Sequence, residues 1–224
     1  MEHSSSLPFV IRIAVYCLGL LILAFGVAVS VNCNLGVSPV SSLPYVISKI
    51  VNMPLGTCTT IVFCGYILLQ ALMLGKEFHP INLLQIVFST IFGYFVDFAK
   101  LVIGDFALPT YLGQLAMLCV SIVLIALGVL LYIDVQLVPM PMEGVSSSLA
   151  KKLGKPFPTM KTVIDCVVVF TGVVLCFLFF GKLDGIREGT IITAIVVGKL
   201  VGILKKPISP ILQKICFGET TETV

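Results

Sequence analysis

Long apolar stretches separated by short polar ones dominate the pattern of hydrophobic and polar positions along the chain. An apolar stretch needs about 20 residues to cross the hydrocarbon core of a bilayer as a helix. Two further apolar pieces, residues 38–51 and 140–153, are too short to cross in this way, and each begins with prolines and small polar residues. Five stretches reach the required length and we count a sixth with them: residues 9–31, 57–75, 81–103, 111–133, 159–181 and 186–204. The pattern predicts an all-α polytopic membrane protein with two interrupted segments.

The two short pieces belong to an internal repeat. Sliding the chain by 102 residues aligns the first piece with the second without a gap, and after a few inserted residues Gly93 falls on Gly198. The identical pairs are Leu35/Leu137, Pro39/Pro141, Lys49/Lys151, Pro54/Pro156, Thr57/Thr159, Thr60/Thr162 and Cys64/Cys166, and Gly26 also falls on Gly128. We therefore predict two related halves, each of three long transmembrane helices plus one short broken or re-entrant helix.

This prediction divides the chain into two membrane repeats and two tails. The N-terminal tail is 1–8, the first membrane repeat 9–106, the second 107–206, and the C-terminal cytoplasmic tail 207–224. The first apolar run is too long for a secretory signal, and no small-residue cleavage site precedes a soluble region. We therefore expect this run to be retained as a transmembrane helix.

The number of passes depends on whether the two short pieces cross the membrane. Crossing gives eight passes, with ten basic residues on the inner flanks and three outside, whereas re-entrant pieces give six passes and a split of nine against four. The positive-inside rule favours eight passes. Four passes per half make the repeats parallel, and three make them inverted. Both arrangements place the two termini in the cytoplasm.

The composition is that of a chain whose surface faces the lipid bilayer. Hydrophobic residues make up 58% of the 224 residues and charged residues 11%, and the mean hydropathy is +1.13. A soluble domain carries about 25% charged residues, because water must solvate its surface. The formal net charge is only +3, and no basic patch is interleaved with aromatic residues. We expect no nucleic-acid partner.

The residue types that carry metal, cofactor or covalent chemistry are not clustered. The eight cysteines lie mostly in apolar runs and form no Cys-x-x-Cys motif, and the two histidines, His3 and His79, lie outside those runs. Zinc and iron–sulfur sites need clustered soft ligands, so we interpret the cysteines as small apolar packing residues. Because no nucleophile motif, phosphate-binding loop or catalytic dyad is visible, we expect no metal, no cofactor and no enzymatic activity.

The paired interruptions are the strongest indication of function. Irregular backbone at membrane depth persists only where protein or a water-filled cavity satisfies its amide groups. Interruptions at corresponding positions of two repeats point to a transporter's binding site. The alternative is that both short helices lie at the membrane interface and that the prolines merely end them.

Polar residues at the interruptions are the candidate substrate-binding group. Glu143 stands at the start of the second short helix, where free amides and the helix dipole stabilise a carboxylate. Helix capping alone also explains Glu143, and close helix packing also explains the serines at 146–148. The candidates are Asn32, Asn34, Ser38, Ser41 and Ser42 at the first interruption, and Glu143, Ser146 and Ser147 at the second. We expect Glu143 and Ser41 to face each other across the repeat axis, in a cavity for a small polar solute.

Charged residues inside membrane helices cost several kcal/mol and are functional candidates by default. The ion-coupling candidates are Asp97, Asp165, Glu143 and Lys199. Simpler explanations are a local pair of Asp97 with Lys100 and a local pair of Asp165 with Lys161. Lys199 either snorkels to the cytoplasmic interface or pairs with Asp97 across the repeat.

Several short motifs carry a resemblance to a known family. They are NLGVSPVSSL at 34–43, LGT at 55–57, IFGYFVDF at 91–98 and GIREGTII at 185–192. The chain resembles the uncharacterised YczE/YitT-type integral membrane proteins of bacteria over nearly its whole length. Where such proteins often carry an acid after the first break, this chain has Ser41, and the acid stands instead at the equivalent position 143. The resemblance implies the fold and a location in the bacterial plasma membrane, and it implies no substrate.

The sequence thus favours a small-molecule secondary transporter whose two repeats move around a polar site near the bilayer midplane. The alternative is a non-transporting membrane partner, either the substrate-binding subunit of a larger transporter or a scaffold for a cytoplasmic enzyme. A homodimer, or a cytoplasmic partner docked at the basic 151–161 loop, fits that alternative, although the loop's charge also serves the positive-inside rule. A channel is disfavoured, because no ring-forming charged or carbonyl filter motif is visible.

Overall fold

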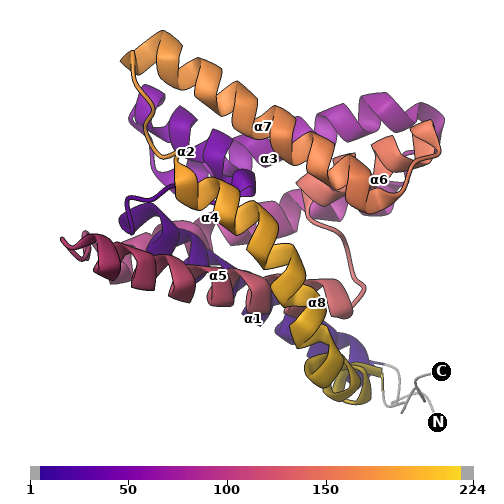
Figure 1. Ribbon diagram of the computed structural model, residues 1–224. Coiled ribbons are helices and arrows are strands. Elements are labelled where there is room, and N and C mark those ends of the chain that lie inside the picture. Colours follow the sequence, from indigo (N-terminus) through magenta and orange to yellow (C-terminus); the bar gives the residue numbers. More distant parts are fainter. Residues whose placement is uncertain (1–5, 218–224) are drawn as a thin grey trace.

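The computed structural model describes residues 6–217, with side chains from residue 9 onward, and this range is helical without a strand (Figure 1). The α-helices are α1 (Ser6–Asn32), α2 (Pro39–Val51), α3 (Leu55–Leu74), α4 (Leu84–Ile103), α5 (Tyr111–Asp134), α6 (Pro141–Leu153), α7 (Phe157–Phe180) and α8 (Glu188–Phe217). Two 3₁₀ turns, Gly75–Glu77 and Pro80–Leu83, connect α3 to α4. The described range therefore has helices as its only regular elements, as the hydrophobic pattern predicts.

Five of the long helical segments are apolar and long enough to cross a bilayer. They are Phe9–Asn32, Leu55–Glu77, Pro80–Ile103, Tyr111–Asp134 and Phe157–Phe180. The sixth predicted stretch lies in α8, which is also long but is not among the five and carries charge at Glu188, Lys199 and Lys205. Together these helices are those of a multi-pass membrane protein.

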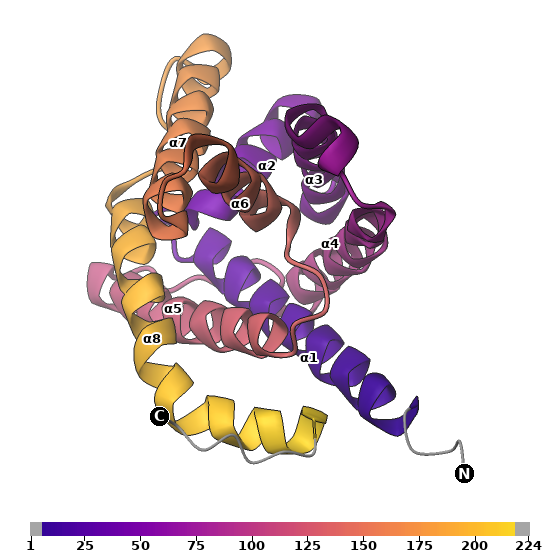
Figure 2. The same cartoon turned by 90° about the vertical axis from the view of Figure 1, so that its right-hand side faces the viewer.

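Both predicted tails are partly helical. Residues 1–5 and 218–224 lie outside the described range, but residues 6–8 begin α1 and residues 207–217 continue α8. Pro207 and Pro210 lie inside α8. A proline within a helix removes one backbone hydrogen bond and kinks the axis, and Figure 2 shows α8 bending along its length.

Helices α1 and α5 cross in opposite directions at the centre of the molecule. The Arg12 guanidinium near the start of α1 donates to the Val135 carbonyl just after α5, and the Ser121 hydroxyl of α5 donates to the Gly26 carbonyl at 3.0 Å. A Cβ placed on Gly128 would lie 2.7 Å from the Gly19 carbonyl oxygen. Small residues therefore allow the two backbones to approach closely, as is common between membrane helices.

Helix α4 lies beside α1 in the same direction, and α3 runs back against α4. The Tyr16 and Phe88 rings lie 4.4 Å apart between centroids, near the starts of α1 and α4. Asn32, at the end of α1, donates to the Gly104 carbonyl just after α4 at 2.8 Å. On α3, the Gly56 amide donates to Asp97 of α4 at 2.6 Å. The chain therefore leaves α1 and starts α3 near the same end of the bundle.

Each short helix packs against a long helix that is distant from it in the sequence, α2 against α7 and α6 against α3. The α2 side chain of Val46 faces Gly172 of α7, and the α6 residue Gly144 lies against the Gln70 side chain of α3. Both short helices begin with a proline in the first turn, where its missing N–H costs nothing. Both end at a residue in the left-handed conformation, Asn52 at φ 53° and Gly154 at φ 61°. Helices α2 and α6 therefore tie together segments that are far apart in the sequence.

The irregular segments before the short helices find partners for their backbone groups. Before α2, Val37 N–H donates to the Gly185 carbonyl at 2.9 Å, and Gly189 N–H donates to the Leu35 carbonyl at 2.7 Å. Before α6, the Tyr16 hydroxyl donates to the Val138 carbonyl at 3.0 Å. Protein groups thus replace water here, as non-helical backbone away from water requires.

The last two helices are arranged differently from α3 and α4. Whereas α3 packs along α4, α7 and α8 scarcely contact each other, and α8 packs on α5 instead. Figure 1 shows α7 and α8 diverging from the loop that joins them. Few contacts therefore join α7 to α8.

Candidate functional site

A cavity of about 460 Å³ lies where the starts of the two short helices meet. All eight α-helices contribute to its wall, and it includes the opening between α7 and α8. Its lining residues are Leu23, Val27, Ser38, Pro39, Val40, Ser41, Phe63, Phe92, Ile125, Val129, Tyr132, Ile133, Met140, Met142, Glu143, Phe157, Pro158, Lys161, Thr162, Asp165, Thr193, Ala194, Val197, Gly198 and Val201. The size is in the range of small-molecule pockets, roughly 300–1,000 Å³.

Glu143 is held in the cavity wall by hydrogen bonds from two elements. The Tyr132 hydroxyl of α5 donates to Oε1 of Glu143. The Met140 backbone N–H donates to Oε2 at 3.2 Å, which is a capping bond at the start of α6. The capping role weighed from the sequence is therefore real. The same carboxylate also lines the cavity, so capping and ligand binding are compatible.

A second acid lines the cavity as half of an ion pair. Lys161 Nζ lies 2.8 Å and 3.1 Å from the two carboxylate oxygens of Asp165, one turn along α7. This is the local pair that sequence analysis offered as an alternative. Both side chains are partly accessible, at 26% and 20% of their surface, and both line the cavity.

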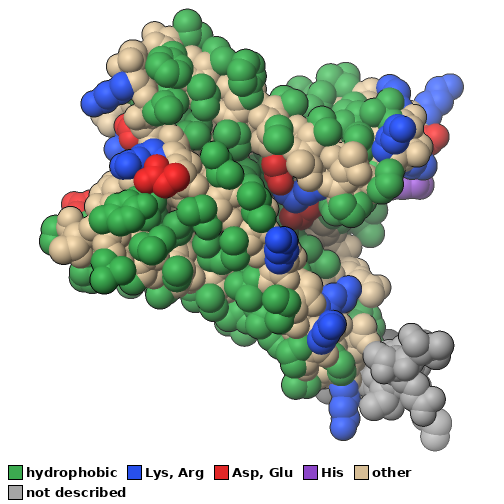
Figure 3. Space-filling model, in the orientation of Figure 1, with side chains coloured by type: hydrophobic (Ala, Val, Ile, Leu, Met, Phe, Trp, Pro, Cys, Tyr) green, Lys and Arg blue, Asp and Glu red, His purple; other side chains and the backbone are tan. Residues whose placement is uncertain are grey.

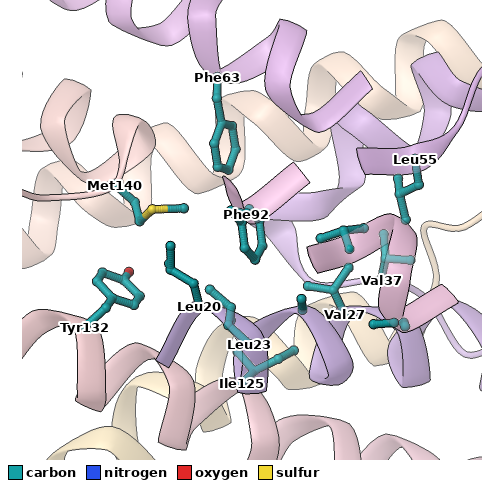
Figure 4. Close-up of a cluster of buried hydrophobic side chains, with 14 of the residues drawn as sticks. Leu20, Leu23, Val27, Val37, Leu55, Phe63, Phe92, Ile125, Tyr132 and Met140 are labelled. Carbon is teal, nitrogen blue, oxygen red and sulfur yellow. The ribbon is translucent and has the colours of Figure 1, made fainter. Parts of the chain in front are cut away.

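Most of the cavity wall is apolar. Figure 4 shows Phe63 of α3, Phe92 of α4 and Met140 before α6 reaching toward the same region, beside Leu20 and Leu23 of α1. The Phe63 and Phe92 rings are stacked, with centroids 5.9 Å apart. The charged groups therefore occupy one part of an otherwise hydrophobic chamber.

The first interruption contributes fewer residues than the sequence predicts. Ser38 and Ser41 line the cavity, and the Ser38 hydroxyl donates to Ser41 Oγ at 3.2 Å. The Ser42 hydroxyl is fully buried and donates to the Pro39 carbonyl at 2.7 Å, within its own helix. Ser41 and Glu143 thus line the same cavity.

Asn32 and Asn34 lie away from the cavity. Asn32 binds the end of α4. Its side-chain oxygen Oδ1 accepts from Lys100 Nζ at 2.7 Å, and its side-chain nitrogen Nδ2 donates to the Gly104 carbonyl. Asn34 is exposed at φ 57°, and its carbonyl accepts from Arg187. The Asn32 carboxamide therefore connects two helices, and Asn34 contributes through its backbone, which the presence of polar residues near a break does not reveal.

The serines of α6 are also outside the cavity wall. The Ser146 hydroxyl is buried and donates to the Met142 carbonyl at 2.9 Å. Ser147 is exposed on the opposite side of the helix. A helix presents neighbouring residues to different faces, so a run of serines could not all reach one site.

Asp97 and Lys199 are not paired with the residues expected from the sequence. Asp97 accepts the Gly56 amide and lines a separate hollow of about 170 Å³ between α3 and α4. Lys100 turns to Asn32 instead of Asp97. Lys199 is exposed on α8, and within residues 9–217 no ion pair joins it to Asp97. Both proposed pairs of Asp97 are therefore absent from the described part.

Four polar cavity residues were not site candidates in the sequence analysis: Tyr132, Thr162, Thr193 and Lys161, the last of which it had treated only as a local partner. Tyr132 and Thr193 are 3% and 1% exposed, and the Thr193 hydroxyl has no hydrogen-bond partner among the described residues. Tyr132 lies near the end of an apolar helix, where a tyrosine is usually interpreted as an anchor at the membrane–water interface. Their position relative to Glu143 depends on the fold, so no local pattern marked them.

The charges of the cavity are visible from the side of α7 and α8. Figure 3 shows acidic and basic side chains in the hollow between these two helices, surrounded by hydrophobic surface. Among the described residues no group of three or more His, Cys, Asp or Glu side chains is arranged to hold a metal ion. The arrangement suits an organic ligand with a polar end and an apolar body.

Comparisons with known proteins identify the family of the chain but find no similar protein of solved structure. The chain is 26% identical over 193 residues to uncharacterized membrane protein YczE of Bacillus subtilis (strain 168), covering 86% of this chain and 84% of that protein. It is 24% identical over 187 residues to uncharacterized protein YyaS of the same strain, covering 83% and 88%. No solved structure matches. Because the family model matches residues 10–206, the chain belongs to the family of unknown function DUF6198, and the YczE-type resemblance of its motifs is confirmed.

Proposed function

We propose that the chain is a secondary transporter that binds a small molecule in the cavity between its two short helices. The observation that supports this proposal most directly is that Ser41, at the start of α2, and Glu143, at the start of α6, line the same cavity. In transporters built from repeats, discontinuous helices place their termini at such a site. The cavity is open beside α7 and α8, whereas the corresponding contact of α3 with α4 is closed.

The transporter is built from two duplicated halves in our proposal. The support is that backbone features recur at a spacing of 102 residues, in agreement with the sequence repeat. Asn34 and Gln136 are both left-handed after a long helix, at φ 57° and 50°. The residues before α2 and α6, Ser38 and Met140, have φ/ψ of −61°/152° and −64°/152°. Shared composition alone does not require such matched dihedral angles.

The halves are inverted and the chain has six passes, in the same proposal. The support is that α1 and α5, which are equivalent helices, cross in opposite directions, and that the first interruption with α2 leaves and returns to one end of the bundle. Apart from Lys199, which lies within α8, the basic residues then divide nine to four. On the side of the termini are Arg12, Lys76, Lys151, Lys152, Lys155, Lys161, Lys205, Lys206 and Lys214; on the other are Lys49, Lys100, Lys182 and Arg187. The positive-inside rule places the termini in the cytoplasm of a bacterial cell.

Coupling to protons or cations is assigned to the two acids of the cavity. Glu143 and Asp165 both line the cavity. Acidic side chains that face a cavity inside a membrane protein commonly mark ion pathways. Alternating access follows if the closed α3–α4 contact and the open α7–α8 contact exchange roles. In an inverted-repeat transporter each half can adopt both the open and the closed packing, and at any time one half is open while the other is closed.

Uptake into proteoliposomes that contain only this chain tests the proposal. Under an imposed proton gradient, a panel of labelled organic cations, anions and neutral solutes is offered to wild type, Glu143→Gln and Ser147→Ala. We expect wild type to accumulate at least one class, Glu143→Gln to lose most of that flux, and Ser147→Ala, whose side chain is outside the cavity, to retain it.

The opposite result favours the non-transporting alternative. Its structural support is the exposure of Lys152 at the end of α6 and of Lys155 between α6 and α7, where an acidic partner has access; the segment 151–161, predicted as a loop, is mostly helical. If the chain alone carries no member of the panel and purifies in fixed ratio with another subunit, the transporter proposal is wrong.

A further inference from the structure

The mouth of the cavity opens toward lipid-facing surface. Phe157 and Pro158 of α7 and Ala194 and Gly198 of α8 are all exposed and all line the cavity. The exposed α8 side chains Ile191, Ile195 and Val196 beside it are apolar, and Lys199 is exposed next to Gly198. Because α7 and α8 scarcely contact each other, a molecule in the bilayer can reach the cavity between them without passing through water.

The interior of the cavity combines apolar walls with an excess of negative charge. Its ionisable side chains are two carboxylates, Glu143 and Asp165, and one ammonium, Lys161, so the formal sum is one negative charge. Asp165 is already neutralised by Lys161 at 2.8 Å, which leaves Glu143 as the unmatched anion. A cation in an apolar chamber is strongly favoured beside such a group, because the low polarity strengthens the attraction.

One further polar atom in the wall lacks a partner. The Thr193 hydroxyl of α8 is buried and has no hydrogen-bond partner within the described residues, and Thr193 lines the cavity. A buried hydroxyl without a partner costs free energy. A donor on a bound ligand removes this cost, so Thr193 is a second polar contact for a ligand that Glu143 attracts.

We propose that the substrate is an amphipathic organic cation that enters the cavity from the bilayer between α7 and α8. Its apolar body lies among Phe63, Phe92 and Val129, and its cationic end lies beside Glu143. This inference rests on the proposed transport function for what happens after binding, but the binding itself is tested independently. In the orientation derived above, entry is from the cytoplasmic leaflet, because Phe157 and Lys161 lie in the first turns of α7, on the side of the termini.

Binding of two probes of the same shape and opposite charge tests the ligand class. Full-length protein in phosphatidylcholine nanodiscs is titrated with labelled tetraphenylphosphonium and, separately, with tetraphenylborate, and binding to empty nanodiscs is subtracted. We expect saturable binding of the cation and at least about tenfold weaker binding of the anion, a difference of roughly 1.4 kcal/mol. Equal binding of both ions, or tighter binding of the anion, overturns the inference.

Charge variants separate electrostatic recognition from loss of fold. We expect Glu143→Gln to weaken cation binding about tenfold or more, since the formal charge of the cavity rises to zero. Lys161→Gln is expected to strengthen it, since the cavity then carries two negative charges. A misfolded variant does not bind more tightly, so a gain with Lys161→Gln supports the assignment. No gain, or a loss with properly folded protein, contradicts it.

Two tryptophan substitutions on one helix test the route. No described atom lies within 4 Å of a Cβ built on Gly198 or on Gly202, but only Gly198 lines the cavity. We expect Gly198→Trp to slow association of tetraphenylphosphonium about tenfold or more and Gly202→Trp to leave it unchanged. If both variants bind at the wild-type rate, the route between α7 and α8 is wrong.

The outcomes also separate this inference from the proposed function. If the cation binds with the expected charge dependence but no solute is transported, the ligand class stands and the transporter proposal fails. If another solute is transported and tetraphenylphosphonium neither binds nor competes with it, transport stands and the inference fails.

Discussion

Gly93 and Gly198 are aligned with each other in the proposed repeat, yet alanine at the two sites should have opposite effects on stability. A Cβ on Gly93 of α4 would contact Thr60 of α3 and would lie 2.6 Å from the Gly56 carbonyl oxygen. A Cβ on Gly198 of α8 meets no described atom within 4 Å. The same substitution therefore tests the closed helix pair against the open one.

The expected magnitudes follow from two opposing terms. Replacing glycine by alanine in a helix stabilises it by about 0.5–1 kcal/mol at either site. Overpacking against backbone costs typically 1–3 kcal/mol, and this cost applies only at Gly93. With about 2–4 °C per kcal/mol for a chain of this size, we expect Gly93→Ala to lower Tm by a few degrees and Gly198→Ala to raise it slightly.

Thermal unfolding followed by a thiol-reactive fluorophore measures both variants. Cys33, Cys58, Cys176 and Cys216 are buried and free, so their exposure reports loss of the fold. Gly65 of α3 provides a control, because a Cβ there also meets no described atom within 4 Å. If Gly93→Ala is as stable as Gly198→Ala and Gly65→Ala, the close α3–α4 packing described here is wrong.

Three further substitutions test other parts of the account. Arg12→Gln removes charge-assisted hydrogen bonds to two carbonyls after α5, each worth about 1.5–3 kcal/mol, so Tm should fall by several degrees in the same thiol assay; an unchanged Tm would show that this contact does not hold α1 to α5. Tyr132→Phe removes the hydroxyl that donates to Glu143, and weaker or altered ligand binding with little loss of Tm is expected; unchanged binding would exclude a role in orienting the carboxylate. Glu77→Gln removes an exposed ion pair to α6, whose side chains are 69% and 63% exposed, and should change stability by less than about 1 kcal/mol; a larger loss of Tm would show that this pair holds α3 to α6.

Local sequence signals located the short helices accurately. The predicted pieces 38–51 and 140–153 correspond to α2 (Pro39–Val51) and α6 (Pro141–Leu153). The length of each apolar piece and the proline and small polar residues at its start are local signals, so they can be read without knowing the fold. The last predicted stretch was different, because α8 continues past Pro207 to Phe217. A proline bends a helix without always ending it.

The candidate site could be predicted only in part, because it depends on how helices cross. Ser41 and Glu143 were linked by the repeat, and both line the cavity. Asn32 is polar and close to a break in the sequence, but its amide turns to the end of α4. Thr193 lies 50 residues beyond Glu143 and enters the same wall because α8 packs on α5. Only the three-dimensional arrangement joins such residues.

Spin-label distances across the two helix pairs test the central claim, exchange between an open and a closed half, most directly. One pair joins Phe170 of α7 to Ile191 of α8, and the equivalent pair joins Leu68 of α3 to Ile86 of α4; all four side chains are exposed. Labels carried by keto amino acids leave the native cysteines in place. We predict two populations whose proportions change between acid and alkaline pH and with tetraphenylphosphonium, the α7–α8 distance shortening as the α3–α4 distance lengthens. A single population in which both distances stay fixed under every condition would contradict the account.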